Sequence, residues 1–225
     1  MKSIIIKALS RFKTQKKLNS RIPGFVTWDQ RKEALQKVIE PHHQFYIQKV
    51  SNERSAISLE TAVMLAFLCE LKKPTRILDV GSGFSSFIFR SYQKTAGKPV
   101  EVVSLDNDAL WLDKTRQYLA SAGLSLDGVM EFDHFLKIKN GKFDIALHDL
   151  GNLDERKKHL RTVLDLAHKD SVIVLDDFHK QHYRENIQQQ LSDLEIDHIS
   201  LCGFTLDKFS RYAAVIAGVP ESIVI

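Results

Sequence analysis

The chain has 225 residues, of which 44% are hydrophobic and 27% charged, and this composition excludes disordered, collagen-like and disulfide-rich chains. The formal net charge is +4, but residues 1–28 contain seven lysines and arginines and no acid, which leaves 25 basic against 28 acidic side chains in the rest. This slightly acidic body argues against nucleic acid as a partner, and no apolar run approaches the roughly 20 residues of a membrane-spanning helix.

Residues 1–21 form a basic segment in which lysines are interleaved with isoleucines, Leu9 and Phe12. The segment has neither the long apolar core nor the small-residue cleavage site of a secretory signal. Three interpretations stay open: a helix that packs on the domain with solvated lysines, a surface that contacts a membrane or another polyanion, and an organelle-targeting peptide.

Two helical regions follow. Residues 27–50 have the pattern of one or two helices broken at Pro41. Ser58 is the expected N-cap of the next helix, which Lys72 and Lys73 close before Pro74. In this helix Cys69 has no metal or redox spacing to Cys202, so we expect two reduced thiols in a cytoplasmic protein.

From residue 76 onward, short apolar runs alternate with helical patterns, as in a parallel sheet covered on both faces. The expected strands are residues 77–80, 101–105, 129–132, 144–147, 171–175, 198–201 and 213–217, and the helices are residues 84–93, 109–120, 153–168 and 181–194. The loop between the last two strands has no helical pattern, so we expect these strands to pair antiparallel. The predicted fold is a three-layer α/β/α sandwich, in which ligands bind at the carboxyl ends of the strands.

The first strand ends in the sequence DVGSGFSS at residues 79–86. Gly81 and Gly83 allow a tight turn and close approach of a ligand, and the following helix presents unpaired N–H groups. A dinucleotide site prefers glycine or alanine where Ser86 stands, so Ser86 and the acid Asp79 before the turn disfavour an NAD-dependent oxidoreductase.

The next two strands also end in acids. Asp106 stands 25 residues after Gly81, where a carboxylate can accept hydrogen bonds from the two ribose hydroxyls of a nucleoside. Asp133 follows the third strand, where an adenine amino group can donate. For Asp108 we favour helix capping over ligand contact.

This pattern resembles the class I S-adenosylmethionine-dependent methyltransferases over residues 58–225. The resemblance implies a Rossmann-like methyltransferase fold, with a mostly parallel seven-stranded sheet and an antiparallel last strand. It divides the chain into a basic helical extension (1–57) and an S-adenosylmethionine-binding domain (58–225).

The same resemblance implies roles for the strand-end residues. Gly81 and Gly83 surround the methionine part of the cofactor, with Asp79 near its amino acid end. Asp106 binds the ribose, and Asp133 contacts adenine. The remaining implied cofactor-binding residue is Ser85, which stands at the third glycine of the common pattern.

Three further acids, Asp149, Asp176 and Asp177, follow the fourth and fifth strands. Clustered carboxylates repel one another unless a positive charge lies between them, and hard divalent cations such as Mg²⁺ prefer oxygen ligands. The arrangement resembles the catechol-type, metal-dependent O-methyltransferases, although Asn152 replaces a lysine of that family. Capping of the next helix by the acid pair is the alternative.

Three histidines close to these strand ends, His148, His179 and His182, are candidate bases, because histidine titrates near neutrality. We favour His179, which follows the acid pair directly, as the base. Together with Asp149 it forms the predicted catalytic set.

The chain contains no Pro-Pro, so it lacks the Asn/Asp-Pro-Pro-Tyr motif of methyltransferases that act on amino groups. Neither cysteine follows proline, as the nucleophile of pyrimidine C5 enzymes does. We therefore expect O-methylation of a small molecule, with S-adenosylhomocysteine as product. An NAD-dependent oxidoreductase and a non-catalytic nucleotide-binding protein are the alternatives, and the sequence leaves the oligomeric state open.

Overall fold

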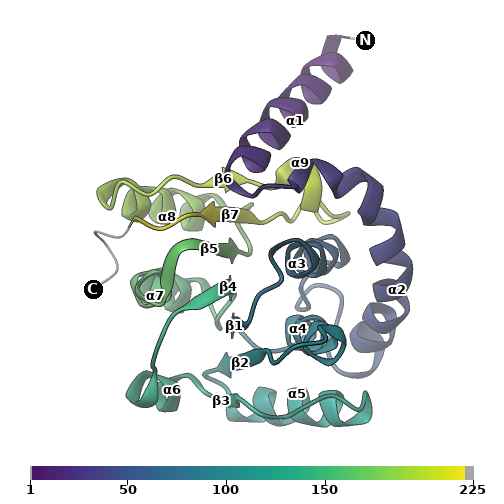
Figure 1. The fold of residues 1–225 in the computed structure, drawn as a ribbon, viewed down its shortest axis with the longest axis vertical. Helices are drawn as coiled ribbons and strands as arrows, with labels where there is room; N and C mark the ends of the chain where they lie inside the picture. Colours follow the sequence, from purple (N-terminus) through teal and green to yellow (C-terminus); the bar gives the residue numbers. More distant parts are fainter. Residues whose placement is uncertain (1, 221–225) are drawn as a thin grey trace.

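The computed structural model describes the backbone of residues 2–220 and the side chains of residues 11–220 (Figure 1). Seven strands form one sheet in the order β3-β2-β1-β4-β5-β7-β6. Their bounds are Arg76–Val80 (β1), Glu101–Asp106 (β2), Val129–Glu131 (β3), Phe143–His148 (β4), Ala167–Leu175 (β5), Ile199–Ser200 (β6) and Ala214–Ala217 (β7). Strands β1 to β5 pair in parallel, and β7 is antiparallel to both β5 and β6. The predicted mostly parallel sheet with an antiparallel last strand is confirmed.

Helices cover both faces of this sheet. Their bounds are Lys2–Arg21 (α1), Trp28–Lys49 (α2), Leu59–Lys72 (α3), Phe84–Thr95 (α4), Ala109–Ser121 (α5), Phe132–Ile138 (α6), Leu153–Asp165 (α7), Gln181–Asp193 (α8) and Cys202–Thr205 (α9), with a 3-10 turn at Phe25–Thr27. Side chains alternate across β1, so Ile77 packs with α3, α4 and α5 while Leu78 packs with α6, α7 and α8. Among the described helices, none is both long and apolar enough to cross a membrane.

Several predicted boundaries are wrong, each for a local reason. Pro41 lies inside a single helix, α2, on its exposed side, while Ile39 and His43 on the other side are buried. Helix α7 stops at Asp165 rather than residue 168, since Ala167 already belongs to β5. A short helix, α9, stands in the loop where none was expected, and its Phe204 is buried.

The segment before α3 shares the core of the sheet domain. Leu18, Ile22, Phe25 and Trp28 are fully buried in the cluster that also contains α3 and α4. The Phe25 ring lies 5.5 Å from that of Phe67 in an edge-to-face contact. The division of the chain at residue 57/58 stays a prediction, and the residues on both sides of it contribute to one core.

Candidate active site

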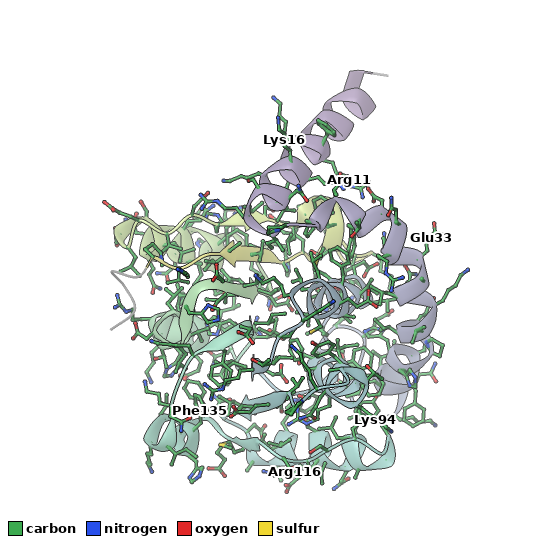
Figure 2. All side chains as sticks on the ribbon, in the orientation of Figure 1. Arg11, Lys16, Glu33, Lys94, Arg116 and Phe135 are labelled. Carbon is green, nitrogen blue, oxygen red and sulfur yellow. The ribbon has the colours of Figure 1, made fainter. Side chains whose placement is uncertain are left out.

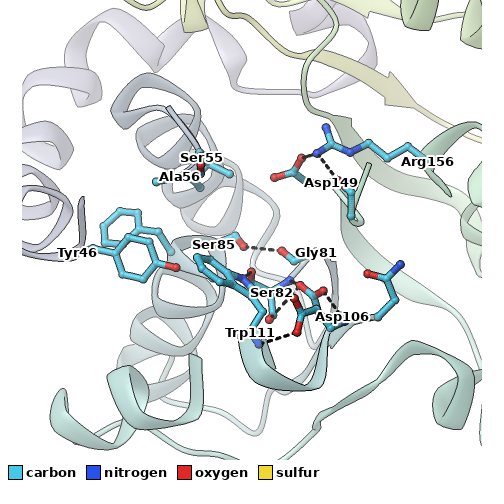
Figure 3. A pocket seen from close by; sticks show the side chains of 16 residues that line it. Tyr46, Ser55, Ala56, Gly81, Ser82, Ser85, Asp106, Trp111, Asp149 and Arg156 are labelled. Carbon is cyan, nitrogen blue, oxygen red and sulfur yellow. Dashed lines mark hydrogen bonds and ion pairs between the residues drawn. The ribbon is translucent and has the colours of Figure 1, made fainter. Parts of the chain in front are cut away.

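A cavity of about 330 Å³ opens at the carboxyl ends of β1, β2 and β4, within the range of small-molecule sites (Figure 3). Its wall combines the turn after β1, the loop after β2, the loop after β4, and parts of α2 and the α2–α3 loop. The lining residues are Tyr46, Ser55, Ala56, Ile57, Gly81, Ser82, Gly83, Phe84, Ser85, Asp106, Asn107, Asp108, Trp111, Asp149, Gly151 and Arg156.

The turn after β1 requires both of its glycines. Gly81 has φ of 110°, and a β-carbon there would lie 2.3 Å from the backbone oxygen of Asp149. Gly83 has φ of 155°, and a β-carbon there would lie 3.0 Å from the hydroxyl of Tyr46. The glycines therefore let the turn pass close to the β4–α7 loop on one side and to α2 on the other.

Asp106 is buried at the end of β2 and lines the cavity. One carboxylate oxygen accepts from the backbone N–H of Ser82 at 3.1 Å, and the other from that of Asp108 at 3.2 Å. Burial raises the pKa of Asp106 to about 6, and these backbone hydrogen bonds oppose the shift. Asp108 accepts from Leu110 N and Trp111 N, which confirms it as the cap of α5.

Asp79 lies beneath the turn rather than in the cavity wall, and it is fully buried. One of its oxygens accepts from the hydroxyls of Ser86 at 2.5 Å and Ser104 at 2.8 Å, while the other has no hydrogen-bond partner. Burial raises the pKa of Asp79, and the serine hydroxyls oppose that rise. Ser86 stands where a dinucleotide site prefers glycine or alanine, and its hydroxyl donates a hydrogen bond to Asp79, the acid before the turn. Ser85 does line the cavity.

The structure does not bring Asp133 to the cavity. Strand β3 ends at Glu131, one residue earlier than predicted, and Phe132 begins α6. Asp133 is exposed in the first turn of that helix.

The acids after β4 and β5 are joined by an arginine. Arg156, from the first turn of α7, lies 2.6 Å from Asp149 and 2.9 Å from Asp177 (Figure 3 shows the first pair). Its guanidinium also donates to the carbonyls of Leu150 and Gly151. Burial alone would lower the pKa of Arg156, but the neighbouring carboxylates raise it. The guanidinium thus supplies the positive charge between these acids.

The predicted metal site at Asp149, Asp176 and Asp177 does not fit this arrangement. Two of the three carboxylates already bind Arg156, and Lys180 lies 2.7 Å from Asp177. Within residues 11–220, no three carboxylate, histidine or cysteine side chains are grouped to hold a metal ion. The sequence analysis missed Arg156, because nothing in the residues around it links it to these acids.

Comparison with known proteins settles the family. A profile of the methyltransferase domain family matches residues 71–208. This chain belongs to that family.

Solved structures show the same fold, as predicted for a class I S-adenosylmethionine-dependent methyltransferase. A Podospora anserina methyltransferase bound to S-adenosylhomocysteine (SAH) is 18% identical with a TM-score of 0.64, over 85% of this chain and 95% of that one. An O-methyltransferase of Bacillus cereus in complex with SAH is 14% identical with a TM-score of 0.61, over 92% and 97%. The O-methyltransferase TomG of Streptomyces achromogenes, in complex with SAM, is 18% identical with a TM-score of 0.55, over 83% and 89%. No curated protein sequence matches the chain.

None of the three candidate histidines lines the cavity of this methyltransferase. His148 is fully buried with Nε2 2.7 Å from the carbonyl of Arg156, and burial lowers its pKa to about 4. His179 has Nδ1 3.6 Å from a carboxylate oxygen of Asp177, and burial lowers its pKa. The side chain of His182 is 99% exposed.

Tyr46 is a cavity residue that the sequence did not suggest. It comes from α2, inside the segment predicted to be an extension, and its side chain is almost completely buried. Its hydroxyl has no hydrogen-bond partner in the described structure and faces the glycine turn (Figure 3). Burial raises the pKa of Tyr46 far above its ordinary value, so the hydroxyl remains a donor. No motif marks this residue, because its position depends on how α2 packs.

Proposed function

We propose that this methyltransferase binds S-adenosylmethionine in the cavity and methylates an oxygen atom of a small molecule, giving S-adenosylhomocysteine. The observation that carries the proposal is that the Gly81–Gly83 turn and the Asp106 carboxylate line one cavity. Two of the solved structures with this fold are O-methyltransferases by name, which supports oxygen as the acceptor.

The polar groups of the cavity fit the cofactor. Asp106 accepts from the N–H groups of Ser82 and Asp108, and the Ser82 hydroxyl, 3.4 Å from Oδ2, can donate to Thr115 instead. A carboxylate has about four acceptor positions, so lone pairs remain for the ribose hydroxyls. The unpartnered hydroxyl of Tyr46 lies beside Gly83 and would donate to the carboxylate of the methionine part. When bound, the cofactor supplies the methyl group, and the protein's task is to align the acceptor with it.

Asp149 is the group that would accept the proton of the substrate hydroxyl. It lines the cavity, whereas His179 does not. Burial, with the neighbouring acids Asp176 and Asp177, raises the pKa of Asp149 well above its usual range, and Arg156 opposes the rise. The Asp149 carboxylate is also held in one orientation by Arg156, at the side of the cavity across from Tyr46 (Figure 3).

Calorimetric titration with S-adenosylhomocysteine, with NAD⁺ in a parallel run, tests the cofactor. We expect micromolar binding of S-adenosylhomocysteine alone, and a loss of that binding in the Asp106→Ala variant. Asp133→Ala is the matched control, since Asp133 is exposed and outside the cavity wall. Binding of NAD⁺ alone, or unchanged affinity in Asp106→Ala, would contradict the proposal.

The acceptor atom needs a second experiment. The purified enzyme is incubated with S-adenosylmethionine labelled in its methyl group and with panels of small alcohols, phenols, amines and thiols. Label transfer to the hydroxyl compounds, and its loss in Asp149→Asn, is the expected result. Transfer to amines or thiols only would refute O-methylation, and cofactor binding without any transfer would favour a non-catalytic binding protein.

A further inference from the structure

Helix α1 leaves the body of the protein beside β6 and α9 and extends away from it (Figure 1). Its last turns are attached to the body: Leu18 is fully buried, and Lys17 lies 2.8 Å from Asp197. Arg11 pairs with Asp29 of α2. The helix continues through residues 2–10, beyond this attached portion. Its base is therefore fixed while its outer half projects from the molecule.

An aromatic ring and unpaired cations stand together where α1 leaves the body. The Phe12 side chain is 66% exposed, although it is one of the largest apolar groups in the chain. Lys13 and Lys16 are exposed as well, and neither forms an ion pair within residues 11–220. Lys16 points away from the sheet domain in Figure 2. This part of α1 thus presents both apolar area and positive charge to the surroundings.

The sequence of the projecting half continues the same pattern. Positions 4, 5, 8 and 9 are isoleucine, isoleucine, alanine and leucine, and they precede position 12 by eight, seven, four and three residues. In a regular helix, positions with these spacings share one side, and the isoleucine at position 6 does not belong to that set. Positions 2 and 7 are lysines, and the first acid of the chain is Asp29. A basic helix with one apolar side has the composition of an interfacial membrane helix.

We propose that α1 attaches the protein to an anionic phospholipid surface. Both features of the helix are then used, because the apolar side enters the headgroup region while the lysines meet lipid phosphates. A nucleic acid would leave the exposed Phe12 ring in water. Pairing with α1 of a second copy would bring two sets of basic side chains together without an acid among residues 1–28 to offset them.

Attachment through α1 leaves the cavity accessible. The helix contacts β6 at one edge of the sheet, whereas the cavity lies at the ends of β1, β2 and β4, with β5 and β7 in between. Variants of α1 are therefore expected to alter lipid binding without altering affinity for S-adenosylhomocysteine.

Co-sedimentation of the 225-residue chain with phosphatidylcholine vesicles, with and without phosphatidylglycerol, tests the proposal. We expect binding to the anionic vesicles only, weakened by high salt. Lys13→Gln combined with Lys16→Gln should reduce partitioning about 25-fold, at about a factor of five per lysine near the surface. The control is Lys37→Gln with Lys49→Gln, two exposed lysines of α2, which should leave partitioning unchanged.

The apolar side is tested by Phe12→Asp against Val38→Asp, since Val38 on α2 is 68% exposed. Phe12→Asp should reduce partitioning about tenfold or more, and Val38→Asp should not. Equal sedimentation with neutral and anionic vesicles, or no effect of Phe12→Asp, would overturn the proposal. The proposal would also be overturned if the vesicles sedimented no protein and the α1 variants abolished binding to RNA instead. A dimer detected by light scattering would likewise contradict it.

Discussion

Arg156 lies 2.6 Å from Asp149, and both residues line the cavity at the carboxyl ends of β1, β2 and β4. The arginine side chain is only 9% exposed, so its charge is poorly solvated and depends on the carboxylates around it. Since Arg156 also binds Asp177 and two carbonyls of the β4–α7 loop, it ties the ends of β4 and β5 to α7. The pair is thus both an electrostatic and a structural element of the site.

Removal of this arginine should therefore be costly. Arg156→Ala removes the cation that pairs with Asp149 and leaves Asp177 with Lys180 alone. These carboxylates are only 15% and 14% exposed, so we expect a loss of about 3–5 kcal/mol in the free energy of unfolding. Arg161→Ala, on the same helix, breaks a half-exposed ion pair of 2.7 Å with Asp165 and should cost about 1 kcal/mol or less. Urea unfolding followed by circular dichroism measures both. Similar small losses in the two variants would show that Arg156 is not needed to balance the acids.

Cofactor affinity should depend on pH through Asp106. The pKa of this carboxyl is about 6 in the free protein, and the ionised form accepts stronger hydrogen bonds and offers both oxygens to the two ribose hydroxyls. Affinity for S-adenosylhomocysteine is then full above pH 7 and about tenfold weaker at pH 5, as expected for binding to the ionised form of such a group. Titration calorimetry across this range measures it. Asp106→Asn should bind weakly at every pH, and a pH dependence that survives in Asp106→Asn would assign it to another group.

Tyr46 should contribute to binding rather than to folding. Its hydroxyl has no partner in the described structure, so Tyr46→Phe removes no hydrogen bond from the protein and should leave the unfolding free energy unchanged within about 0.5 kcal/mol. Affinity for S-adenosylhomocysteine should fall about tenfold, the value of one hydrogen bond to a charged group. Tyr183→Phe is the matched control, because Tyr183 is also buried with an unpartnered hydroxyl but does not line the cavity. Equal affinities in the two variants would remove Tyr46 from the binding site.

The strand ends were predictable because each depends on neighbouring residues. A short apolar run predicts β1 and is followed by Gly81 and Gly83, and a second run predicts β2, which ends in Asp106. Because β1 and β2 pair in parallel, their carboxyl ends lie side by side, and this brings the glycines and Asp106 together. The end of β3 before Asp133 was predicted one residue too late for an equally local reason. Phe132 and Phe135, three residues apart, already have the helical spacing of α6, but Phe132 also stands two residues after Met130, which is the spacing of a strand.

Arg156 and Tyr46 could not be assigned from their surroundings in the sequence. Arg156 reaches the acids only because α7 starts at Asn152, and its second partner, Asp177, comes from the end of a different strand. Tyr46 depends on α2 packing along α3, through contacts between residues far apart in the chain. In the sequence, Asp149, Asp176 and Asp177 suggest a metal site because no cation is visible beside them. Only the tertiary structure shows that the guanidinium of Arg156 supplies the positive charge.

At the opposite end of the sheet, Asp144 should make stability depend on acid pH. Its carboxyl accepts from the backbone N–H groups of Thr75 at 2.6 Å and Arg76 at 3.0 Å, and lies 3.0 Å from His168 Nε2. Burial favours a higher pKa, but these contacts outweigh it and hold the pKa of Asp144 at about 2.

Since this value lies below that of the unfolded chain, the ionised carboxylate stabilises the fold above about pH 4, and this contribution declines as the pH falls toward 2. The side chain is 30% exposed, so we expect Asp144→Asn to cost about 1–2 kcal/mol at pH 7 rather than the full value of the shift. Urea unfolding at pH 7 and pH 3 should show the difference from wild type shrinking to about half. Asp170→Asn, at an exposed position of β5, should change stability little at either pH. A cost for Asp144→Asn that is the same at both pH values would mean that the charge of the carboxylate contributes nothing to it.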